Sequence, residues 1–197
     1  ACAPYRRLFL CDQNLEYIKP EKITSTDNLL LEVSLAAQHE GESIVKNYKQ
    51  LGHHTAEGIC TALARSFADI GDIIRGKDLY LGNKKQNEIQ REKQKLQQNL
   101  RSIFAKIYDQ LKSEAKAFYT EDKRDGNFYQ LREDWWNANR LEVWKAMTCG
   151  APSNAYYFRA TCGTGTPTNE KCLCIDGTVP TNLDYVPQYL RWFEEWA

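Results

Sequence analysis

The residues with the widest chemical scope in this chain are its seven cysteines, which can form disulfides, bind a metal ion or act as nucleophiles. Three of them, Cys162, Cys172 and Cys174, crowd a segment rich in turn residues. A structural zinc site usually needs a second cysteine pair or histidines, but the three histidines all lie within residues 39–54. The sequence therefore favours disulfides over zinc, and an oxidising compartment in which disulfides persist.

No set of polar residues has the pattern of a catalytic site. His53 and His54 stand without a serine or cysteine in a nucleophile motif, and the 163–165 turn lacks the lysine of a phosphate-binding loop. Adjacent acids such as Glu133 and Asp134 point about 100° apart on a helix, so they do not converge on one substrate. The sequence thus predicts a protein that is not an enzyme and that uses no cofactor and no metal.

Basic residues concentrate between Lys84 and Lys116, where nine basic and four acidic side chains occur. A helical projection at about 100° per residue gathers several of these basic residues in one stripe, roughly opposite the apolar face. The stripe consists of Lys84, Arg91, Lys95, Lys106 and Lys116. It could bind a sulfated glycan, because neutralising a polyanion releases counterions. The alternative is a solvated helix face with ordinary ion pairs along the helix.

Arg6 and Arg7 form a second candidate binding element, because they lie between two cysteines. If disulfides fix this segment, the guanidinium groups could bind a carboxylate or sulfate of a ligand. They could equally pair within the chain, with acids such as Asp12 or Glu16. The sequence leaves both alternatives open.

The overall composition limits the partners. Lys and Arg total 26, as do Asp and Glu, so no net field attracts nucleic acid or an anionic membrane. The apolar runs are far shorter than the roughly 18 residues of a membrane span, which predicts no direct membrane insertion. The 42% of hydrophobic residues is enough for one core or two small ones.

Apolar periodicity predicts a mainly α-helical fold in which helices must position the candidate residues. We expect helices over 27–52, 59–75, 83–119 and 128–149, with a last helix from about Val186. The 83–119 segment should be the longest. Helical spacing places most of the five tryptophans in the core, although Trp136 points about 100° away from Trp135 and could be partly exposed.

Four blocks of the sequence, in order and in register, match a known family. The blocks are 1–11, 66–76, 131–136 with 143–149, and 184–196. Together they resemble the Duffy-binding-like alpha domain of the Plasmodium falciparum erythrocyte membrane protein family, a variant surface antigen of malaria parasites. The resemblance covers essentially the whole chain, and it suggests a domain truncated at both ends.

The resemblance implies a disulfide-stapled helical bundle of the Duffy-binding-like type. It implies an N-terminal disulfide-rich part over 1–26, a main helical subdomain over 27–150, and cysteine-rich loops with the start of the next helical part over 151–197. It further implies that Cys2 and Cys11 pair with upstream cysteines and that Cys60 could pair with Cys149.

In function, the resemblance implies an extracellular adhesion domain displayed on the infected erythrocyte. Its partners would be host glycans, such as heparan sulfate or blood-group sugars, or host surface proteins, in cytoadhesion or rosetting. Antibodies are further possible partners, and so is a neighbouring domain of the same chain. The alternative is a structural scaffold that packs on a neighbouring receptor-binding domain, which exposed tryptophans would favour.

Overall fold

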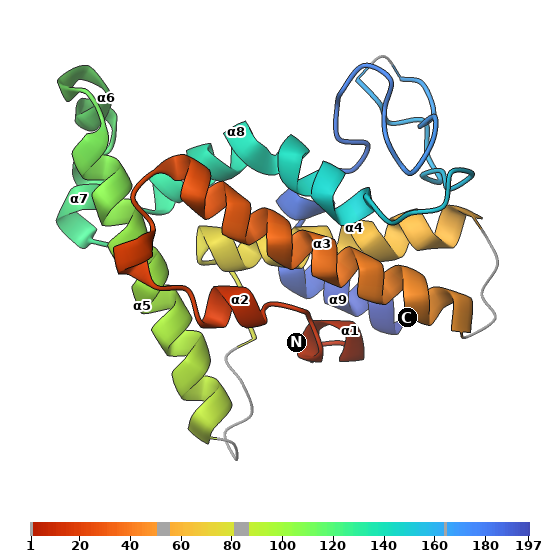
Figure 1. Ribbon diagram of the computed structural model, residues 1–197, viewed down its shortest axis with the longest axis horizontal. Helices are drawn as coiled ribbons and strands as arrows, with labels where there is room; N and C mark the ends of the chain where they lie inside the picture. The colour runs from red at the N-terminus through yellow and green to blue at the C-terminus, as the bar shows by residue number, and fades with distance from the viewer. Residues whose placement is uncertain (1, 51–55, 81–86, 164) are drawn as a thin grey trace.

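The computed structural model describes residues 2–50, 56–80, 87–163 and 165–197, and within these ranges the chain forms helices and no strand. Figure 1 shows α3, α4, α8 and α9 side by side, with α5 crossing one end of this bundle. The mainly α-helical fold class is therefore confirmed. The elements are α1 (Tyr5–Leu8), α2 (Gln13–Glu16), η1 (Pro20–Lys22), α3 (Thr26–Gln50), α4 (Ala56–Arg75), α5 (Asn87–Gln110), α6 (Ser113–Phe118), α7 (Thr120–Asp125), α8 (Tyr129–Thr148), η2 (Leu183–Tyr185) and α9 (Gln188–Trp196).

The centre of the bundle is an aromatic cluster between α4 and α8. The ring centroid of Phe67 lies 5.1 Å from that of Trp136 and 5.2 Å from that of Trp144. Both tryptophans are completely buried, so the expectation of a partly exposed Trp136 is wrong. Gly71 makes room for the Trp136 ring, because a Cβ at position 71 would lie 2.8 Å from it. The ring faces α4 and not solvent, since α4 covers that side of α8.

A second glycine brings α3 and α8 into backbone contact. A Cβ at position 41 would lie 2.0 Å from the carbonyl oxygen of Met147, so only glycine fits at this crossing. The helix expected over 27–52 is confirmed as far as Gln50, and residues 51–55 lie outside the described ranges.

The end of α4 is closed by two backbone hydrogen bonds around Gly76. The amide of Gly76 donates to the Ile73 carbonyl and the amide of Lys77 donates to the Asp72 carbonyl. This pairing, with Gly76 at φ +74°, is the Schellman arrangement that ends many helices.

The single helix expected over 83–119 is interrupted after Gln110, and its first residues, 83–86, lie outside the described ranges. In the structure α5 ends at Gln110, and Lys112 is extended with ψ 156° before α6 begins. The turn lets the Tyr119 hydroxyl donate to Asp134 of α8 at 2.9 Å and brings Lys116 to within 5.7 Å of the Tyr108 ring. Because this segment holds no proline or glycine, the break depends on contacts that periodicity does not reveal. Among the described residues α3, with 25 residues, is longer than α5.

The disulfides differ from the pairing that the resemblance implied. Cys60 of α4 bonds to Cys172, and Cys162 bonds to Cys174. Cys149 is a free and exposed thiol, so the expected Cys60–Cys149 disulfide is corrected. The physical reason is the course of the 151–174 segment: Trp144 donates from Nε1 to the Cys172 carbonyl, which holds Cys172 over the buried side of the bundle.

Candidate functional site

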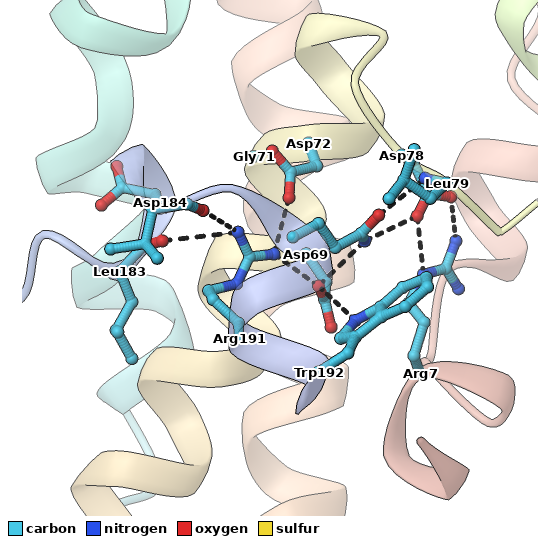
Figure 2. Close-up of polar contacts among 12 residues, drawn as sticks. Arg7, Asp69, Gly71, Asp72, Asp78, Leu79, Leu183, Asp184, Arg191 and Trp192 are labelled. Carbon is cyan, nitrogen blue, oxygen red and sulfur yellow. Dashed lines mark hydrogen bonds and ion pairs between the residues drawn. The ribbon is translucent and has the colours of Figure 1, made fainter. Parts of the chain in front are cut away.

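A network of buried charged side chains holds α9 against α4 (Figure 2). Arg191 of α9 donates from Nη2 to Asp69 Oδ1 and to Asp72 Oδ2, each at 2.6 Å. Arg6 of α1 lies 2.7 Å from the other Asp69 oxygen. Asp69 and Asp72 are three residues apart, which places both carboxylates on the α4 face that meets α9. This network holds α1 and α9, which lie at opposite ends of the sequence, against α4.

The two aspartates of this network have opposite pKa shifts. Burial disfavours the charged form of Asp69, but Arg6 and Arg191 outweigh burial and lower its pKa below the usual value. Burial raises the pKa of Asp72 to about 6, because it outweighs the attraction of Arg191 and Arg75. One carboxylate is thus held firmly in its charged form, while its neighbour titrates nearer to neutral pH.

The network continues through Asp184 to α8. Arg140 donates from Nη2 to Asp184 Oδ1 at 2.7 Å, and Trp136 donates from Nε1 to Asp184 Oδ2 at 2.9 Å. Arg75 also donates to the backbone carbonyl of Asp184 and pairs with Asp72 at 2.9 Å. Every charged side chain of this network pairs with another described residue, although Arg191 Nε has no hydrogen-bond partner there. The network therefore joins α4, α8 and α9 through internal pairs.

Arg6 and Arg7 belong to the interior and not to an exposed turn. Arg7 is 1% exposed and pairs with Asp78, in the segment after α4. The suggested partners Asp12 and Glu16 instead accept hydrogen bonds from Lys93 of α5, at 2.7 and 2.6 Å. The structure therefore favours pairing of Arg6 and Arg7 within the chain over contact with a ligand. Their partners are not Asp12 and Glu16, the nearby acids that the sequence suggested. The acids that Arg6 and Arg7 do contact are distant in sequence.

The predicted basic stripe is divided in the structure. Lys84 lies outside the described residues, whereas Arg91 and Lys95 are exposed on the first half of α5. Lys106 donates to the Pro20 carbonyl at 2.5 Å, and Lys116, on α6, donates to the Asp109 carbonyl at 2.8 Å. Arg91 and Lys95 remain as neighbouring positive charges without an ion pair to another described residue.

The turn-rich segment provides no thiolate for a metal. Cys162, Cys174 and Asp176 have potential ligand atoms within 4.8 Å of one another. The two sulfur atoms, however, form a disulfide, which removes them as thiolate ligands.

Sequence reasoning did not single out Asp69, Asp72, Asp184 or Arg191, although these residues form the polar centre of the bundle. The sequence did carry a signal, because Asp69 and Asp72 interrupt an otherwise apolar stretch of the 59–75 helix. In the structure residues 66–75 are all buried. Charged residues at such positions need partners, and Arg191 stands in the equally apolar 189–193 segment. The pairing itself needed the three-dimensional arrangement.

The outer face of α9 is apolar and open. Phe193 is 76% and Trp196 is 54% exposed, and together with Tyr189 and Leu190 they line a hollow of about 610 Å³ next to Cys2. Tyr5 of α1 extends this face, with its ring 6.0 Å from that of Trp196. No helix in the described part of the chain has the length and apolarity needed to cross a bilayer. Large exposed apolar patches of this kind mark interaction sites on proteins.

Comparison with known proteins relates this fold to solved structures. A PfEMP1 DBLbeta domain solved bound to ICAM-1 is 35% identical, with a TM-score of 0.73, and the match covers all of this chain and 44% of that one. The NTS-DBL1(alpha-1) domain of the Plasmodium falciparum membrane protein 1 (PfEMP1) from the varO strain is 46% identical, with a TM-score of 0.84. That match covers all of this chain and 43% of the solved one.

A curated relative and a family model also relate the chain to Duffy-binding proteins. The Duffy receptor gamma form of Plasmodium knowlesi is 23% identical over the whole of this chain, which spans 15% of the length of that relative. The model of the Duffy binding domain family matches residues 1–191. The chain therefore belongs to the Duffy binding domain family, and it has the fold of the alpha-type domains of PfEMP1.

Proposed function

We propose that this chain is an extracellular adhesion domain of a parasite variant surface antigen, displayed on the infected erythrocyte, that binds host receptors in cytoadhesion or rosetting. The observation that carries the proposal is the match of the whole chain, in sequence and in fold, to an alpha-type PfEMP1 domain. A related DBLbeta domain has been solved bound to ICAM-1, so this fold supports a protein receptor. The receptors of this chain would be host glycans or surface proteins, and antibodies would bind the same exposed surfaces.

The first test is binding of the oxidised protein to uninfected red cells and to heparan sulfate over a series of salt concentrations. If Arg91, Lys95 and the rest of the predicted stripe bind a polyanion, binding falls as salt rises. The variant Arg91→Ala/Lys95→Ala should then bind heparan sulfate more weakly and with a smaller salt dependence. The variant Lys123→Ala/Arg124→Ala, which removes two exposed charges elsewhere, is the matched control. Equal loss in both variants would show that only net charge matters.

A second candidate function is a scaffold that packs on a neighbouring domain. The exposed Phe193 and Trp196 on α9 favour it, because a patch of this kind usually lies in an interface. The variant Phe193→Ser/Trp196→Ser separates the two functions. Loss of association with a neighbouring domain, together with unchanged binding to red cells, would show that the patch serves assembly and not receptor binding.

A further inference from the structure

The helices α1 and α9 contact each other directly, although they lie far apart in the sequence. Arg6 of α1 donates to both carboxylate oxygens of Glu195 on α9, at 3.0 and 2.8 Å. Trp196 donates from Nε1 to the Cys2 carbonyl at 3.0 Å, and its ring centroid lies 6.0 Å from that of Tyr5. These contacts join α1 to α9 without passing through the rest of the bundle.

The two helices also share the carboxylate of Asp69 on α4. Arg191 of α9 donates to one oxygen at 2.6 Å, and Arg6 of α1 lies 2.7 Å from the other oxygen. Figure 2 shows Trp192 of α9 on the first oxygen as well, at 3.4 Å. The Asp69 side chain is fully buried, so losing one arginine while the other helix still covers it leaves a buried charge with less compensation.

The same sharing occurs at Asp78, in the segment that follows α4. Its Oδ1 accepts from Arg7 Nε of α1 at 3.2 Å and from the side-chain amide of Gln188 of α9 at 2.8 Å. Gln188 in turn accepts from the backbone amide of Leu79 at 2.6 Å, which fixes the segment to α9. Two carboxylates are therefore each bound by one residue of α1 and one of α9. Docking of either helix prepares the partners of the other, so the two docking steps are coupled reciprocally.

Apolar burial contributes little to the docking of α1. Tyr5 is 71%, Leu8 is 41% and Phe9 is 77% exposed, so α1 depends on the shared ion pairs. The covalent cross-link does not help either, because the loop closed by Cys60 and Cys172 contains neither α1 nor α9. The disulfide therefore holds the bundle together and leaves these two helices to their own contacts.

We propose that α1 and α9 form a clasp that docks on α4 and is released from it as one cooperative unit, while the remaining bundle stays folded. Units of this kind open at a free energy below that of global unfolding. The closed clasp assembles the apolar face described above, because Tyr5 comes from α1 whereas Phe193 and Trp196 come from α9. Release of the clasp takes this face apart. The clasp operates in this way whether or not the chain serves adhesion.

Hydrogen exchange of the oxidised protein, followed by NMR over a series of low urea concentrations, tests the proposal. The reporters are backbone amides that donate within or next to each helix: those of Leu8 and Phe9 for α1, and those of Leu190 and Arg191 for α9. We expect the two sets of amides to share one opening free energy and one urea dependence. Both should open more readily than the amides of α4 and α8.

Two variants test the coupling from either side. Arg6→Ala removes the contacts of α1 with Asp69 and Glu195, yet it should lower the protection of the α9 amides by about tenfold to a hundredfold, the range expected for lost hydrogen bonds to charged groups. The milder variant Glu195→Gln, on α9, should lower the protection of the α1 amides. In both variants the amides of α4 and α8 verify that the bundle is folded.

The matched control is Arg124→Ala, which removes an exposed arginine that pairs with Glu121 within α7. It should leave the protection of both sets of amides unchanged. The proposal is overturned if Arg6→Ala lowers the protection of α1 alone, or if the two sets open with different free energies. It is equally overturned if both sets exchange only when α4 and α8 do, because the clasp would then be part of the global unit.

Discussion

At the scale of single residues, the buried aspartates of α4 hold α1 and α9 in place through ion pairs with Arg6 and Arg191. Asp69 and Asp72 contact the same arginine, yet their pKa values move in opposite directions because the balance of burial and attraction differs. These two groups therefore affect stability in different pH ranges.

We expect the Asp72 carboxyl to titrate near pH 6 in an NMR titration of its side-chain carbon. Since its folded pKa is raised above the unfolded value of about 4, the contribution of Asp72 stabilises the fold below pH 4 and is lost as pH rises through 6. The stability advantage of the wild type over Asp72→Asn should fall by up to about 3 kcal/mol between pH 4 and pH 7. Asp69 acts in the opposite direction: its contribution is present above the unfolded pKa of about 4 and is lost as pH falls toward its lowered folded pKa. A midpoint near pH 4 for Asp72 would contradict this account.

Arg7 provides a second prediction at this scale. The change Arg7→Ala leaves the Asp78 carboxylate, whose side chain is 7% exposed, without its guanidinium partner. Breaking a buried ion pair by removing one partner costs about 3–5 kcal/mol of unfolding free energy. Urea unfolding measures the loss, with Arg124→Ala, which breaks an exposed ion pair, as the control. If the Arg7→Ala protein is as stable as the wild type but binds the receptor more weakly, Arg7 contacts the ligand, as the first of the two sequence-based alternatives holds.

At the scale of elements, the crossing of α3 and α8 depends on Gly41. The change Gly41→Ala forces a methyl group into the carbonyl of Met147, so the helices must separate. We expect a loss of at least about 2–3 kcal/mol in unfolding free energy, as for an overpacked core. Gly150→Ala is the matched control, because the added Cβ would be at an ordinary 3.7 Å from Glu42. Similar melting temperatures for the two variants would show that the crossing adapts.

At the scale of the whole molecule, the Cys60–Cys172 disulfide closes the larger of the two disulfide loops, with a sequence separation of 112. The double variant Cys60→Ser/Cys172→Ser should lose about 4–5 kcal/mol, because the cross-link restricts a long loop in the unfolded chain. Cys149→Ser should change the unfolding free energy little, since Cys149 is exposed and unbonded. Peptide mass mapping of the oxidised protein decides the pairing directly, and a Cys60–Cys149 peptide would overturn it.

The sequence by itself determined the fold class, the positions of α3, α4, α8 and α9, and the family. These features depend on the spacing of apolar residues along one segment or on blocks of adjacent residues, and both are local information. Local information also explains where the predictions were wrong. Nothing within 83–119 marks the break before α6, and the Asp134 carboxylate that Tyr119 contacts after the break lies outside that segment.

Only the tertiary structure decided which partner each reactive residue takes. Cys60 pairs with Cys172, Arg7 with Asp78, and Lys93 with Asp12 and Glu16, although other partners were available. The physical reason is that pairing energies fall steeply with distance, so a partner is chosen by how separate segments pack and not by their order in the chain.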